Sequence, residues 1–112
     1  MTDKILDWDL ATKVAGNRET ATEIFHMFKR SLSAEKKNIE TAYADSELAL
    51  QDATHKVHGA LSYCGLPRLK HAACQLETAL KKGESDKIKA LYESLMQEMD
   101  AAAEVLLSEI ED

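Results

Sequence analysis

Two histidines and a glycine stand close together in the segment DATHKVHGALSYCG, residues 52–65. The spacing of His55, His58 and Gly59 places them on adjoining parts of one helix surface. A neutral imidazole is a nucleophile near pH 7, and it also binds metal ions. Glycine costs an exposed helix interior about 1 kcal/mol relative to alanine, so Gly59 is expected to serve something outside the helix.

The helix predicted around these residues, over about 46–64, has a buried and an exposed face. Apolar side chains recur at steps of three and four and form the buried face: Leu50, Ala53, Val57, Leu61 and Cys64. A second set with the same spacing forms the exposed face: Leu48, Gln51, His55, Gly59 and Ser62. We therefore expect an exposed His55, with a shallow notch one turn later through which a partner can approach the ring.

A carboxylate in the following helix is predicted to lie at the level of His55. His55 stands ten residues before Gly65, and Glu77 stands ten residues after Pro67. At about 1.5 Å per residue, both would lie roughly 15 Å from the turn on antiparallel neighbours. Glu77 could then accept a hydrogen bond from Nδ1 of His55 and leave Nε2 as the nucleophile. The alternative is an ordinary solvated carboxylate.

The rest of the sequence predicts an all-α protein, because it holds one proline, four glycines and few β-branched runs. A short helix is expected over about 7–15, and Ser33 is expected to begin one of the later helices. The bundle helices are predicted over about 18–32, 34–44, 46–64, 67–82 and 85–109. Short connections make neighbours antiparallel, so the expected fold is an up-down four-helix bundle with a short N-terminal helix, a single domain over 1–112.

Composition limits the class of partner. The formal net charge of −6 argues against nucleic acid or an anionic membrane surface. No apolar run is long enough to cross a bilayer. Cys64 and Cys74 fit a reducing compartment as small unpaired side chains. We expect a cytoplasmic, monomeric domain that makes no direct membrane contact.

The segment HKVHGALSYCGLPRLKHAACQLE, residues 55–77, resembles the signature of histidine-containing phosphotransfer (HPt) domains. The matching positions are His55, His58, Gly59, Ala60, Gly65, Leu69, Leu76 and Glu77. The resemblance extends to the short N-terminal helix and is greatest to the C-terminal HPt modules of BarA/GacS-type hybrid sensor kinases. The sequence departs from the family pattern at His58, where most members have lysine, and at Ala72-Ala73, where a larger pair is common.

The resemblance implies a step in a phosphorelay. His55 would accept a phosphoryl group from an aspartate in the receiver domain of a hybrid sensor kinase. It would pass the group to the receiver aspartate of a response regulator. The domain would bind no cofactor and no ATP of its own and would not be an enzyme, because the receiver supplies Mg²⁺. A hybrid sensor kinase holding such a piece would be a histidine kinase of the inner membrane, with this module on its cytoplasmic side.

The residues around His55 have predicted supporting roles. His58 would donate a hydrogen bond, or act as a cation, beside the phosphoryl group. A partner-docking surface is predicted from five residues: Leu48, Lys56, Ser62, Arg68 and Lys70. Each has an ordinary alternative, since lysines on helices are usually solvated and single exposed leucines are common.

Two other function classes remain open from the residues. In the first, the chain is a non-catalytic helical interaction domain and His55 is incidental. In the second, a small metal-binding bundle uses His55, His58 and His71 as ligands. Two histidines at this spacing plus one across a hairpin form a poorly defined ligand set for Zn²⁺, so no metal site is predicted.

Overall fold

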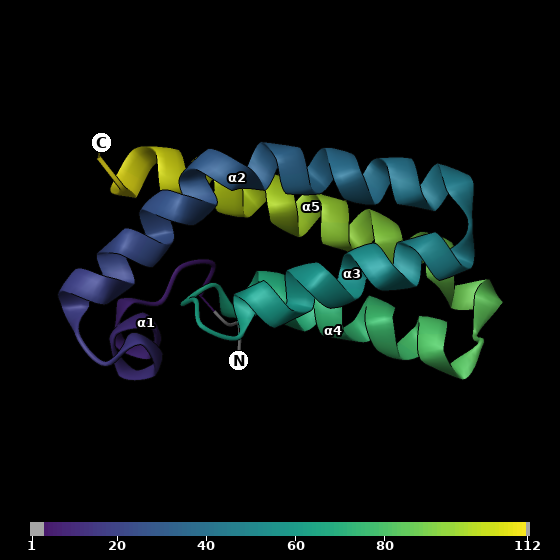
Figure 1. Cartoon of the computed structure of the whole chain (residues 1–112), viewed down its shortest axis with the longest axis horizontal. Coiled ribbons are helices and arrows are strands. Elements are labelled where there is room, and N and C mark those ends of the chain that lie inside the picture. The colour runs from purple at the N-terminus through teal and green to yellow at the C-terminus, as the bar shows by residue number, and fades with distance from the viewer. Residues whose placement is uncertain (1–3, 112) are drawn as a thin grey trace.

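The computed structural model describes residues 4–111, which fold into helices joined by short connections (Figure 1). The helices are α1 (Trp8–Ala15), α2 (Arg18–Asp45), α3 (Glu47–Leu61), α4 (Pro67–Lys82) and α5 (Ser85–Glu109). The four long helices run alternately up and down, so the predicted all-α bundle is confirmed. Each helix packs against the next along the chain, and α2 also contacts α5 and closes the bundle.

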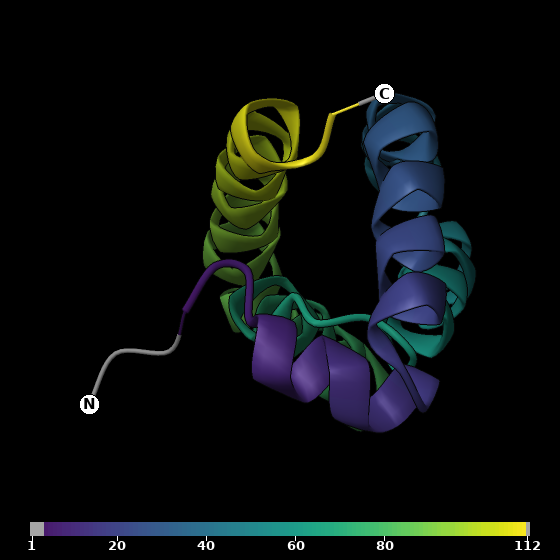
Figure 2. The ribbon, with the colours of Figure 1, turned by 90° about the vertical axis from the view of Figure 1, so that its left-hand side faces the viewer.

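Helix α1 lies across one end of the bundle instead of joining its four sides (Figure 2). The indole of Trp8 in α1 packs edge to face against Phe25 of α2, with a distance of 4.8 Å between the ring centroids. The Arg18 guanidinium carbon lies over the same indole, 4.2 Å from its centroid. These contacts fasten α1 to the first turns of α2.

Side-chain caps explain where the first three helices begin. Asp7 accepts a hydrogen bond from the backbone N–H of Leu10 at 3.0 Å, which caps α1. Asn17 accepts from the N–H of Thr20 at 2.8 Å, and Ser46 caps α3 through the N–H of Ala49. Each cap satisfies a donor that has no partner within its own helix.

The prediction of two separate helices over 18–32 and 34–44 is wrong, because both belong to the continuous helix α2. Ser33, the expected start of the second, is an exposed residue in the middle of α2. Leu32 and Ile39 lie seven residues apart and are both buried, so the apolar stripe continues in phase past the serine. Serine caps a helix only where the backbone turns, and no glycine or proline interrupts the chain here.

Helix α3 is shorter than the predicted 46–64, since it ends at Leu61. Gly65, the residue after the predicted end, lies beyond the helix and has no positive φ. The reason for a glycine is close approach: a Cβ at this position would overlap the carbonyl oxygen of Asp7 and lie 2.5 Å from Cβ of Ala11. The N–H of Asp7 donates to the Gly65 carbonyl at 2.8 Å, so this contact joins α1 to the α3–α4 connection.

Alanine substitutions at two glycines should have opposite effects on the free energy of unfolding. Gly65→Ala should lower it by about 1–3 kcal/mol, because the added methyl group pushes against α1. Gly59→Ala should raise it by up to about 1 kcal/mol, because a Cβ there meets no atom within 4 Å. Urea denaturation of both variants measures the difference. A Gly65→Ala protein as stable as wild type would show that the approach of α1 imposes no such constraint.

Candidate functional site

Glu77 is a carboxylate buried between α3 and α4, on the face of α4 that packs against α3. The residue is 4% exposed, although glutamate is seldom buried without partners. It follows Leu76 and precedes Ala79, both of which are also buried. The apolar face of α4 therefore carries Glu77 towards α3.

Three side chains surround the Glu77 carboxylate. Nδ1 of His55 contacts Oε2, and Nδ1 of His58 lies 2.7 Å from Oε1. The ammonium of Lys81, one turn further along α4, lies 3.3 Å from Oε2. Glu77 and Lys81 belong to α4 and the two histidines to α3, so the hydrogen bonds of the histidines join the two helices at this level.

The electrostatics of Glu77 determine which ring nitrogens carry a proton. Burial by itself raises the pKa of this carboxyl group, but the hydrogen bonds from His55, His58 and Lys81 outweigh burial and hold the pKa below its ordinary value. Glu77 is therefore ionised near neutral pH and can only accept hydrogen bonds. Both Nδ1 atoms must donate to it, which leaves Nε2 of a neutral ring with a free lone pair.

Exposure separates the roles of the two histidines. The His55 side chain is 70% exposed, whereas that of His58 is 27% exposed. Nδ1 of each ring points inward to Glu77, and the His55 ring lies open to solvent. A reactant from solution therefore meets His55 first.

The predicted neighbours of His55 on α3 lie on the open surface. Leu48 is 71% exposed, and Lys56, Gly59 and Ser62 are exposed as well. Space is open at Gly59, where a Cβ would meet no atom within 4 Å. Ser62 is the C-cap residue that follows α3, and its hydroxyl donates to the His58 carbonyl at 3.3 Å. The exposed face of α3 thus carries an apolar, a basic and a reactive side chain together.

The two α4 residues of the predicted docking surface, Arg68 and Lys70, lie away from Glu77, and a different cation of α4 contacts it. Arg68 is directed to α5, where it pairs with Glu98 at 2.9 Å, because the first turn of α4 faces that helix. It precedes Glu77 by nine residues, about 13 Å along the helix axis. Lys70 is exposed in the same early part of α4. Lys81 supplies the cation next to Glu77, and its spacing of four residues from Glu77 is the pattern by which the sequence reveals it.

The metal-binding alternative gains no support from the geometry. Across residues 4–111, no group of three or more His, Cys, Asp or Glu side chains is arranged to hold a metal ion. His71 lies on α4 beside a shallow depression with Cys74 and Leu91, and this group does not include His55 or His58.

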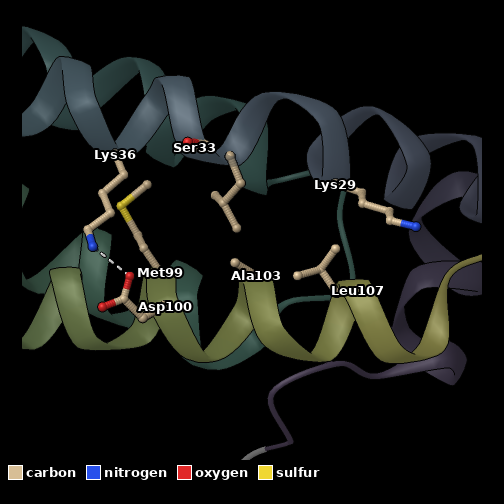
Figure 3. A pocket seen from close by; sticks show the side chains of 8 residues that line it. Lys29, Ser33, Lys36, Met99, Asp100, Ala103 and Leu107 are labelled. Carbon is tan, nitrogen blue, oxygen red and sulfur yellow. Dashed lines mark hydrogen bonds and ion pairs between the residues drawn. The ribbon is translucent and has the colours of Figure 1, made fainter.

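A larger cleft lies between α2 and α5 and is separate from the histidine site (Figure 3). Leu32, Met99, Ala103 and Leu107 line it together with polar and charged side chains of both helices. An ion pair between Lys36 and Asp100 crosses it at 2.6 Å. The cleft contains none of the residues that surround Glu77.

Comparison with known proteins identifies the family. Residues 23–108 match the family described as Hpt domain. The chain is 35% identical to the sensor histidine kinase GacS of Pseudomonas protegens over 92 residues, 80% of this chain and 10% of GacS. It is 34% identical to the signal transduction histidine-protein kinase BarA of Shigella flexneri over 102 residues, 88% of this chain and 11% of BarA. The chain thus spans about a tenth of the length of these relatives.

A solved structure shares the fold. The HPt domain of a sensor hybrid histidine kinase from Shewanella superposes with a TM-score of 0.70 at 29% identity, covering 93% of this chain and 95% of that one. The chain therefore has the fold of an HPt domain and belongs to the HPt domain family. No helix within residues 4–111 has both the length and the apolar character needed to span a membrane.

Glu77 should make the stability of the domain sensitive to acid. A lowered pKa means that its contribution is complete above the ordinary carboxyl value of 4.5 and is lost as pH falls through the lowered value. Glu77→Gln should lower the free energy of unfolding at pH 7 by about 1–3 kcal/mol. This deficit should shrink below pH 4.5.

Urea denaturation between pH 7 and pH 3 measures the deficit, with Glu93→Gln as the control at an exposed glutamate of α5. A deficit for Glu77→Gln that stays constant over this range would contradict the assignment of an ionised, hydrogen-bonded Glu77.

Proposed function

We propose that His55 accepts a phosphoryl group from a receiver-domain aspartate and passes it to the aspartate of a second receiver. The observation that carries this proposal is the exposed His55 ring, whose Nδ1 is occupied by a buried, ionised Glu77. Membership of the HPt family supports the same reaction class. The relatives GacS and BarA, named as histidine kinases, support a two-component signalling context.

The transfer needs little apparatus on the side of this domain. The lone pair of His55 Nε2 attacks phosphorus, the new N–P bond forms, and the P–O bond to the donor aspartate breaks. The electron pair of that bond leaves with the aspartate carboxylate. The Nδ1 proton stays in its hydrogen bond to Glu77, which stabilises the positive charge that the phosphorylated ring acquires. Reversal of these steps delivers the group to the second receiver.

Metal binding and positioning of the phosphoryl group would be the work of the receivers. The receiver would hold Mg²⁺ and position the phosphoryl group, as electrostatic stabilisation of phosphoryl transfer requires. This domain would act as a carrier that draws on no nucleotide or metal of its own. His58 would share the Glu77 carboxylate and keep it in place beside His55.

The proposed partners are the receiver of a hybrid sensor kinase and the receiver of a response regulator. They would dock on the exposed face of α3, where Leu48 offers an apolar contact, Lys56 a positive charge and Gly59 open space. We further propose that the domain acts as a monomer in the cytoplasm, where its two free cysteines, Cys64 and Cys74, would stay reduced.

Replacing the acceptor tests the proposal directly. His55→Gln should take up no phosphoryl group, either from phosphoramidate or from a phosphorylated receiver. Its free energy of unfolding should fall by no more than about 1 kcal/mol, since His58 and Lys81 still pair with Glu77. Intact-protein mass spectrometry measures the uptake, and urea denaturation measures the stability.

His71→Gln is the matched control, because it removes an exposed histidine of α4. It should be phosphorylated at the wild-type rate, with an acid-labile, base-stable product. Full uptake by His55→Gln together with its loss in His58→Gln would move the acceptor to His58.

A further inference from the structure

Tyr63 is an exposed aromatic residue just beyond the end of α3. It is 67% exposed, although its neighbours Leu61 and Cys64 are buried. The N–H of Ser62 donates to the Gly59 carbonyl at 3.2 Å, so the backbone keeps turning in the helical sense after α3 ends. The N–H of Cys64 donates to the Leu61 carbonyl, also at 3.2 Å. Tyr63 therefore lies about one turn beyond Gly59.

The spacing of Tyr63 places it with the exposed residues of α3. It follows Gly59 by four residues and Lys56 by seven, the spacing of residues that share one side of a helix. All three residues are exposed. A Cβ at Gly59 would meet no atom within 4 Å, so this position leaves open space between His55 and Tyr63. An approaching protein thus meets no side chain at position 59.

Apolar surface continues from Tyr63 towards α2. Ala60 precedes Tyr63 by three residues, is exposed, and lines a small pocket of about 110 Å³ between α2 and α3. Met27 of α2 lines the same pocket and is 59% exposed. Single exposed apolar side chains are common, whereas adjoining ones are typical of an interaction surface. We call Met27, Ala60 and Tyr63 the apolar edge.

The size of an ordinary interface connects the apolar edge to His55. Tyr63 follows His55 by eight residues, about 12 Å along the helix axis. A standard interface buries about 800 Å² on each partner, which is a round patch roughly 30 Å across. A patch of this size centred on His55 extends roughly 15 Å in every direction. A protein that docks over His55 therefore also covers Tyr63.

We propose that Tyr63 is an aromatic anchor for the receiver domain, which places an apolar side chain against the apolar edge. This inference rests on the proposed function, because it needs a receiver at His55. It deepens that function by naming a contact residue outside the docking surface predicted from the sequence. A tyrosine buries a large area with few rotatable bonds, and such residues often dominate the free energy of binding.

Two phosphoryl donors separate docking from chemistry. Phosphoramidate needs no docking surface: His55 Nε2 forms the N–P bond, the P–N bond of the donor breaks, and ammonia leaves. The second donor is a receiver domain phosphorylated with acetyl phosphate and selected for transfer to the wild-type protein. The measured quantity is kcat/KM with the receiver divided by the initial rate with phosphoramidate.

Tyr63→Ala should lower this ratio about tenfold, mainly through a higher KM for the receiver, as loss of an aromatic anchor weakens binding. Tyr63→Phe should keep the wild-type ratio, because it keeps the ring. Leu107→Ala is the control, since Leu107 is 70% exposed but lies beside the cleft between α2 and α5. It should also keep the wild-type ratio, and urea denaturation should show that all three variants remain folded.

A wild-type ratio in Tyr63→Ala would overturn the role of Tyr63 and leave His55 as acceptor. A ratio in Tyr63→Phe or Leu107→Ala as low as that of Tyr63→Ala would also overturn it, because the loss would then not come from the ring at position 63. A wild-type protein that takes up no phosphoryl group from any receiver would overturn both proposals.

Discussion

The site depends on the burial of a single carboxylate. An ionised glutamate among apolar side chains is unfavourable unless hydrogen bonds replace the water it has lost. Glu77 meets this requirement with two imidazoles from α3 and one ammonium from α4. Because Glu77 belongs to α4 and both imidazoles belong to α3, the carboxylate holds the two helices in one register and fixes the orientation of both rings.

In the proposed function, this constraint would make His55 a nucleophile that reacts through one ring nitrogen. An ionised carboxylate cannot donate a proton, so each Nδ1 that faces it must carry the hydrogen. The free lone pair of a neutral His55 ring is then at Nε2. The remaining difference between the histidines is one of access, and it favours His55, whose side chain is 70% exposed, over His58, at 27%. The chemistry of the site thus follows from burial on one side of the ring and exposure on the other.

The helical pattern predicts the fold well where apolar periodicity is continuous, and less well where a local signal has two meanings. Ser33 resembles a helix start, but the buried stripe runs past it and α2 does not break. Gly65 resembles a helix end, yet its role is to admit α1, a contact between distant segments that no local pattern contains.

In the site, too, the sequence predicts what regular helix geometry determines and misses what depends on contacts between distant residues. Counting residues from the turn places His55 and Glu77 at one level, because helix rise is regular and the connection is short. The direction of a long, flexible side chain depends on its neighbours in three dimensions. Arg68 therefore turns to Glu98, while Lys81 joins Glu77.

Nuclear magnetic resonance of the phosphorylated, ¹⁵N-histidine-labelled protein identifies the nitrogen that carries phosphorus, and so shows whether Glu77 selects the reactive atom. We expect phosphorus on Nε2 of His55, with Nδ1 still protonated and hydrogen-bonded to Glu77. Phosphorus on Nδ1 of His55, or on either nitrogen of His58, would contradict the claim that the buried carboxylate selects the reactive atom.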